Sequence, residues 1–90
     1  MVSSRKIKYL NIEKAIADLL AETIKKRRTD LGIKQGELAS IAGLSYGYIC
    51  RLERGDIGNP GIGSAARLCL LLDIDIQDLV TKAWATLPPK

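Results

Sequence analysis

Residues 35–55 read QGELASIAGLSYGYICRLERG, and this stretch determines which fold the chain can adopt. Apolar residues recur at helical spacing in two short runs, residues 35–42 and residues 46–54. Gly43 separates the two runs, and glycine lets the backbone turn sharply through positive φ at no steric cost. The small side chain of Ala39 falls where two crossing helices would come closest. The pattern therefore predicts two helices joined by a tight turn, a helix-turn-helix.

The apolar residues of this motif fall at the positions that clamp a helix pair onto a core. They are Leu38, Ala42, Leu44, Ile49 and Leu52. An ordinary helical hairpin is the weaker explanation, because seven suitable positions, counting Ala39 and Gly43, occur together within about twenty residues.

The remainder of the chain also has the pattern of helices. Asn11 is suited to cap a first helix of about twenty residues, which ends before Gly32. Residues 62–72 predict a fourth helix, and Asp75 is expected to cap a fifth helix that runs to about Ala85. The fold class expected from these patterns is all-α, with five helices and an N-terminally extended first helix.

Ninety residues suffice for one small domain. We expect residues 1–10 to form a basic, partly extended arm and residues 11–87 to form the domain, with the helix-turn-helix at residues 35–54. Residues 1–55 contain eleven Lys or Arg and six Asp or Glu, whereas residues 56–90 contain three and four. The positive first part is typical of a surface that meets a polyanion, although a solvated charged helix has the same composition.

The composition argues against several classes of protein. The chain has no His, and it shows neither a nucleophile elbow nor a phosphate-binding loop, so we do not expect an enzyme. Cys50 and Cys69 are too few for a metal cluster or a disulfide framework, and neither a metal nor another cofactor is predicted. No apolar run resembles a signal peptide or a membrane span, so a cytoplasmic protein without a membrane partner is expected.

A set of residues between position 24 and about position 80 matches the pattern of a known family. They are Ile24, Arg28, Leu31-Gly32-Ile33-Lys34-Gln35, Glu37-Leu38-Ala39, Ala42-Gly43-Leu44-Ser45, Ile49, Leu52-Glu53-Arg54-Gly55, Asn59-Pro60, Leu68 and Leu71-Leu72-Asp73-Ile74. In these residues the chain resembles the phage repressor and Cro type of helix-turn-helix protein, the XRE family. The resemblance implies a five-helix, lambda-repressor-like DNA-binding domain. It also implies that the partner is double-stranded DNA, commonly a palindromic operator bound by a homodimer.

The resemblance also implies which residues meet DNA. The candidate DNA-binding residues are Lys34, Gln35, Ser45, Tyr46, Gly47, Tyr48, Arg51, Arg54 and Asn59. Gln35 is expected to touch a phosphate and to brace the start of the recognition helix, residues 46–54. Arg51 is the strongest candidate for base readout, because a guanidinium pairs bidentately with guanine. Better-known members often carry Gln pairs where this chain has Tyr46-Gly47-Tyr48, so their operator rules do not transfer.

Arg28 and Glu53 are expected to form an ion pair between the first helix and the end of the third, as the family places them. Each is a charged residue at a position that faces a neighbouring helix and is otherwise surrounded by apolar residues. Such a pair is better understood as fixing orientation than as adding net stability. Arg28 is therefore not counted among the DNA contacts, although its neighbours are basic.

Two functions remain open from the sequence. The first is a sequence-specific transcriptional regulator, a repressor or controller, that acts as a homodimer. The alternative is an antitoxin-type module that neutralises a protein partner and autoregulates its operon, which predicts a partner that co-purifies. The dimer surface is also open, since an apolar stripe of the first helix that includes Ile12 and Ile16, or Trp84 near the C-terminus, suits such a contact.

Overall fold

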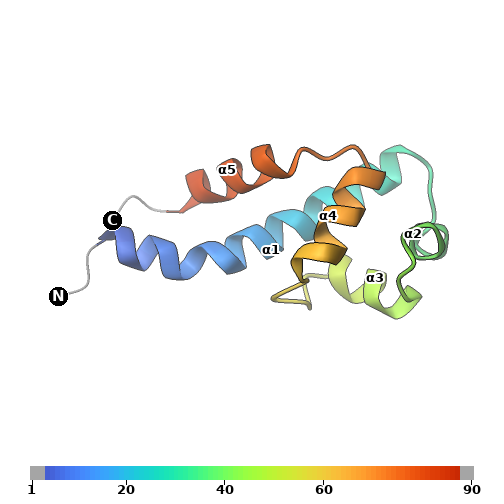
Figure 1. Cartoon of the computed structure of the whole chain (residues 1–90), viewed down its shortest axis with the longest axis horizontal. Coiled ribbons are helices and arrows are strands. Elements are labelled where there is room, and N and C mark those ends of the chain that lie inside the picture. The colour runs from blue at the N-terminus through green and yellow to red at the C-terminus, as the bar shows by residue number, and fades with distance from the viewer. Residues whose placement is uncertain (1–3, 88–90) are drawn as a thin grey trace.

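A computed structural model describes the backbone of residues 4–87 and the side chains of residues 11–87. The elements are the helices α1 (Ser4–Asp30), α2 (Gln35–Ala42), α3 (Tyr46–Glu53), α4 (Ile62–Leu71) and α5 (Ile76–Thr86) (Figure 1). The described part of the chain contains no strand, so the all-α prediction is confirmed. None of these helices is both long enough and apolar enough to cross a membrane.

The long helix α1 organises the rest of the molecule. α5 packs alongside its N-terminal half, and α2, α3 and α4 gather around its C-terminal half (Figure 1). The two described ends of the chain consequently lie at the same end of the molecule (Figure 1). α2 and α3 pack on each other, which gives the predicted helix-turn-helix at the opposite end.

The core is built from aliphatic side chains, as a chain without Phe requires. The largest fully buried side chains are Leu20, Ile24, Leu38, Ile49, Leu52, Leu68 and Leu72. Of the apolar positions predicted for the motif, only Leu44 is partly exposed, and it still packs against the core. Ala39 is buried, as expected for a residue at the crossing of α2 and α3.

The ends of the helices follow the predicted signals closely. Gly43 adopts φ +68°, and its N–H bonds to the last turn of α2. The Ser45 hydroxyl accepts a hydrogen bond from the Tyr48 N–H, so Ser45 caps α3. Asp75 caps α5 by accepting from the N–H groups of Gln77 and Asp78. Small polar residues accept such bonds because the first N–H groups of a helix lack helical partners.

The N-terminal part of the chain differs from the prediction. α1 begins at Ser4 and not at Asn11, so residues 4–10 are helical where an extended arm was expected. Residues 1–3 lie outside the described part. The stretch from Arg5 to Leu10 contains no Gly or Pro, and extending an existing helix costs far less than starting one. The N-cap signal at Asn11 was therefore not sufficient to stop the helix.

Candidate nucleic-acid interface

α3 has one face in the core and one face directed away from it. Ile49 and Leu52 are fully buried, whereas Tyr46 is 60% exposed and Gly47 and Arg51 are also exposed. Residues 47 and 51 share a face because neighbours on a helix surface are three or four positions apart, and the exposed Tyr46 borders that face in the first turn. The structure thus brings these three predicted DNA-binding residues together on the outer face of α3.

The Arg51 side chain extends back along α3 toward its first turn. Its Nη1 atom lies 3.9 Å from the place where a Cβ on Gly47 would stand. Among the described residues, no hydrogen bond or ion pair engages this side chain. All five guanidinium N–H groups are therefore available to an external acceptor.

A shallow hollow of about 550 Å³ adjoins the outer face of α3 at the start of α2. Lys34, Gln35 and Tyr46, three of the predicted contacts, line it together. The positive dipole end of α2 favours an anion here, and the Glu37 carboxylate, which accepts from the Lys34 N–H at 3.1 Å, also lines the hollow. A side-chain hydrogen bond with Cys50 raises the pKa of Tyr46, so its phenol stays protonated.

The predicted pair of Arg28 and Glu53 fixes α3 from the inner side. Arg28 Nε and Nη2 donate to the two Glu53 carboxylate oxygens at 2.6 and 2.9 Å, and Nη1 donates to the Ile33 carbonyl at 2.7 Å. The Glu53 side chain is only 2% exposed. Hydrogen bonding to Glu53 raises the pKa of Arg28, so the arginine remains positively charged. A bidentate pair of this kind sets orientation as well as distance.

Gln35 belongs to the same inner network. Its Nε2 donates to Glu53 Oε1 at 3.0 Å, and its Oε1 accepts from Cys50 Sγ at 3.5 Å. Gln35 therefore braces α3, but it does so at the second half of the helix and not at the predicted start. The contact with a phosphate that the sequence suggested for Gln35 stays a prediction.

Tyr48 lies apart from the outer face. Its ring is partly buried against the core, and its hydroxyl donates to the Pro60 carbonyl at 2.9 Å. This bond ties α3 to the loop that follows it, residues 54–61. Helical spacing alone could not reveal this bond, because spacing does not show that the loop folds back toward α3.

Two further predicted contacts lie on that loop. Arg54 Nε pairs with Asp56 Oδ2 at 3.0 Å, and both side chains are exposed. Asn59 Oδ1 accepts from the Gly61 N–H at 3.4 Å. Neither residue lines the hollow at the start of α2.

One supporting residue was missed by the sequence reasoning. Arg67 of α4 donates from Nη1 to the Ala42 carbonyl at 2.8 Å. It thereby satisfies a free carbonyl at the C-terminal end of α2, next to the turn. The only signal in the sequence is a single cation in an apolar helix, which does not show what the cation reaches.

A family model described as "Helix-turn-helix" matches residues 24–79, which is more than half of the chain. The match covers α2, α3, α4 and the Arg28–Glu53 pair. No curated protein matches the chain. The five-helix fold, the turn at Gly43 and the family match agree with one another. The chain therefore belongs to the helix-turn-helix family of the phage repressor and Cro (XRE) type, a family of DNA-binding regulators.

Proposed function

We propose that this protein is a sequence-specific transcriptional regulator, a repressor or controller, that binds a palindromic operator as a homodimer. The observation that carries the proposal is the Arg51 guanidinium, which has no bonding partner among the described residues and lies on the outer face of a helix whose inner face is fixed by buried bonds. An α-helix fits the major groove of B-DNA, where a guanidinium can read the two acceptors of guanine.

The other residues have distinct parts in this proposal. Lys34, Gln35 and Tyr46 surround the hollow at the start of α2, where a phosphate of the duplex would be held. Ser45 and Gly47 keep the start of α3 small, so the backbone can approach the bases. Contacts with phosphate set the register of the protein on the duplex, whereas contacts with base edges carry sequence information.

Arg54 and Asn59 are proposed to contact the backbone on the other side of the recognition helix. Tyr48 takes a positioning role in place of direct DNA contact, because its hydroxyl is already bonded to Pro60. The pair of Arg28 and Glu53 likewise does not contact DNA in this proposal, and it affects binding only by orienting α3. Residues that set the angle of α3 affect affinity for every DNA sequence, whereas Arg51 affects the choice among sequences.

The proposal is tested by selecting preferred sites from a library of random duplexes and then measuring mobility shifts at two salt concentrations. The wild type is expected to select one palindromic sequence, with binding that weakens as salt rises. Arg51→Ala should lose about 5-fold to 150-fold of the discrimination between the selected site and a site with one changed guanine.

Arg54→Ala and Lys82→Ala serve as controls in this experiment. Arg54→Ala should weaken binding to all sequences about equally, as the loss of a phosphate contact does. Lys82 lies on α5 with an exposed side chain, so Lys82→Ala should change neither affinity nor discrimination. If the wild type selects no sequence, the regulator proposal fails and the search turns to a protein partner of the antitoxin kind.

A further inference from the structure

The turn between α2 and α3 closes most of the C-terminal end of α2 with its own backbone. The Leu44 N–H bonds to the Ala39 carbonyl at 2.9 Å, and the Gly43 N–H bonds to the Ser40 carbonyl at 3.3 Å. A helix that ends at a glycine commonly satisfies its last carbonyls through such a pair of bonds. Neither bond reaches the carbonyl of Ala42, the last residue of α2. That carbonyl needs a donor from elsewhere in the molecule.

The donor to the Ala42 carbonyl comes from α4. Arg67 donates to it from Nη1 at 2.8 Å. Ala42 is only 1% exposed, so water could not easily replace this donor. α2 has no basic residue in its own last turn. Arg67 therefore also brings a positive charge to the negative end of the α2 dipole.

The Arg67 guanidinium lies against the turn itself. Gly43 adopts φ +68°, and a Cβ built on it would stand 3.4 Å from Arg67 Nη1. Among the described residues beyond the chain neighbours of Gly43, no other atom lies within 4 Å of that position. The bond is thus made at the point where the chain leaves α2 and turns toward the first residues of α3.

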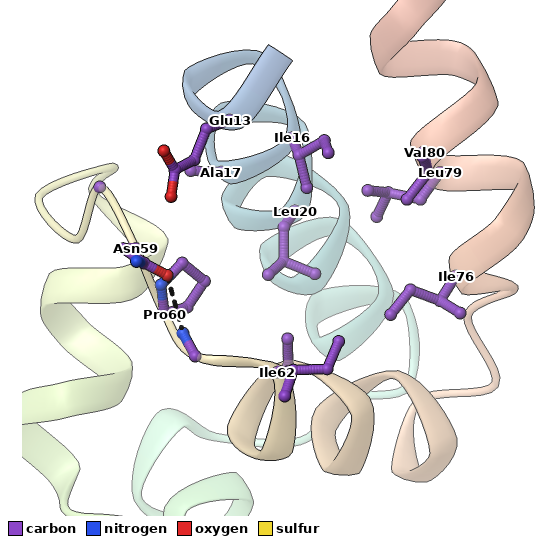
Figure 2. Close-up of a pocket in the computed structure, with 13 residues that line it drawn as sticks. Glu13, Ile16, Ala17, Leu20, Asn59, Pro60, Ile62, Ile76, Leu79 and Val80 are labelled. Carbon is purple, nitrogen blue, oxygen red and sulfur yellow. Dashed lines mark hydrogen bonds between the residues drawn. The ribbon is translucent and has the colours of Figure 1, made fainter. Parts of the chain in front are cut away.

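α4 is a firm support for this bond. Leu68 and Cys69 on its inner side are buried in the core. At its N-terminal end, Ile62 stands at the edge of an apolar groove of about 250 Å³, which Leu20 of α1 and Leu79 of α5 also line (Figure 2). Closely packed interiors deform little, so a side chain that projects from α4 can hold the turn in place.

α2 is consequently held by side-chain bonds at both ends. Its first residue, Gln35, donates to Glu53, and its last residue, Ala42, accepts from Arg67. A short helix that is fixed at one end can pivot about that end, whereas a helix fixed at both ends keeps its direction. The end that Arg67 holds leads directly into α3, and the Arg28–Glu53 pair holds the far end of α3.

We propose that Arg67 is a positioning residue for DNA binding, which holds the turn and thereby sets where the first turn of α3 stands against the duplex. This inference rests on the proposed function, since DNA is the ligand that α3 would meet. Arg67 acts through the Ala42 carbonyl and not through a contact with DNA. Without it the end of α2 can move, so Gly47 and Arg51 meet the duplex in a wider range of positions and affinity for every sequence falls.

The same substitution at two arginines tests the proposal in mobility shifts with the selected operator. Arg67→Met removes the donor but keeps the stem of the side chain, and this exposed position should tolerate the change. Affinity should fall about 10-fold. Arg27→Met is the matched control, because Arg27 Nε likewise donates to a carbonyl at a helix end, that of Leu72 at 3.0 Å, outside the helix-turn-helix. It should lower the urea midpoint similarly and leave the affinity unchanged.

Two further readouts separate positioning from a direct contact. Arg67→Lys keeps a charged donor on a long stem, so it should recover most of the affinity that Arg67→Met loses. The dependence of affinity on salt should have the same slope in Arg67→Met as in the wild type, because a positioning residue neutralises no phosphate. A direct contact of Arg67 with a phosphate would instead lower that slope by about one.

Amide hydrogen exchange of the protein without DNA tests the bond by itself. The N–H groups of Gly43 and Leu44 should exchange about 10-fold faster in Arg67→Met than in the wild type, because the turn opens locally when its support is lost. In Arg27→Met the same two groups should exchange at the wild-type rate.

The outcomes separate this inference from the regulator proposal. The positioning role is overturned by equal losses of affinity in the two Met variants, by a salt slope that falls by about one, by an Arg67→Lys variant that binds no better than Arg67→Met, or by unchanged exchange at the turn. A wild type that selects no DNA sequence refutes the regulator instead, and the exchange rates alone then decide whether Arg67 holds the turn.

Discussion

The two ends of the molecule share one aliphatic core but differ in the polar bonds that accompany it. At the end with α2 and α3, bonds with Glu53 join Arg28 of α1 and Gln35 of α2 to α3, in addition to buried aliphatic side chains such as Ile49. At the end with α1 and α5, buried aliphatic side chains such as Leu20 and Leu79 make the contact. The ion pairs found on the two helices there, such as Lys14–Asp18, are exposed and lie within one helix.

The difference matters because the two kinds of contact restrict motion differently. A bidentate hydrogen-bonded pair is strong only at one distance and one angle, so it fixes how α3 is oriented. Apolar burial depends mainly on the area removed from water, so it holds α5 on α1 without prescribing each angle. Precise orientation thus occurs at the end that carries the helix-turn-helix, where we propose that DNA is read.

The largest expected effect is that of Glu53→Ala. The substitution leaves the Arg28 guanidinium, which is mostly buried, without its carboxylate partner. An arginine side chain stays charged even so, because its guanidinium does not lose its proton in proteins. Breaking a buried pair in this way costs about 3–5 kcal/mol of unfolding free energy. Urea unfolding followed by circular dichroism measures the loss.

Asp56→Ala is the matched control, since it breaks the exposed pair with Arg54. An exposed pair contributes at most about 1 kcal/mol. Equal losses in Glu53→Ala and Asp56→Ala would show that the polar network at the α2–α3 end has no special role.

Tyr48→Phe is expected to have an intermediate effect. It removes the hydrogen bond to the Pro60 carbonyl and keeps the ring, which should cost about 1 kcal/mol of stability. Affinity for the selected operator should fall, because the loop no longer holds α3 from its far side. Tyr46→Phe provides the contrast: Tyr46 is exposed, so that variant should weaken DNA binding with little change in stability. If Tyr48→Phe and Tyr46→Phe change stability and DNA affinity by the same amounts, the distinct role assigned to Tyr48 is wrong.

The same contrast explains how far the sequence could predict the structure. The limits of α2 at Gln35–Ala42, the turn at Gly43 and the cap at Asp75 were predicted, since local residue chemistry sets each of them. The Arg28–Glu53 pair was predicted from the resemblance, and the structure confirms it. The predicted start of α1 at Asn11 was wrong, because the tendency of a helix to extend is set by a whole stretch of residues and not by one capping residue.

The internal roles of Tyr48 and Arg67 could not be predicted from the sequence. Each side chain bonds to a carbonyl that lies far along the chain, on Pro60 and on Ala42. Helical periodicity indicates the face of a helix on which a residue begins, but it does not show which carbonyl a long side chain reaches. The groove at Ile62 was missed for the same reason, since it is formed by three separate segments.

The smallest expected effect is a loss of folding stability at alkaline pH, caused by the Cys69 thiol in the apolar core. Burial raises the pKa of the Cys69 thiol in the folded protein, whereas the unfolded chain releases this proton near the ordinary value of 9.0. The unfolded state therefore loses the proton first, and stability should be constant below pH 9 and fall as the pH rises above it. Urea midpoints between pH 7 and pH 10 measure the slope.

Cys69→Ala should remove that part of the alkaline slope, at the expense of a lower stability at pH 7. Cys50→Ser should keep the slope, because Cys50 is only partly buried at the edge of α3. A slope that survives in Cys69→Ala but disappears in Cys50→Ser would assign the titration to the polar end instead.

The outer face of α3 has a consequence for how such a protein can change its target. Among the side chains of residues 11–87, those that bond α3 to the rest of the molecule include Arg28, Gln35, Glu53 and Tyr48, and the Arg51 side chain is not among them. Positions 47 and 51 are therefore free to vary without a penalty in folding. Under the proposed function, substitutions at these two positions would change which DNA sequence is read while the scaffold beneath stays constant.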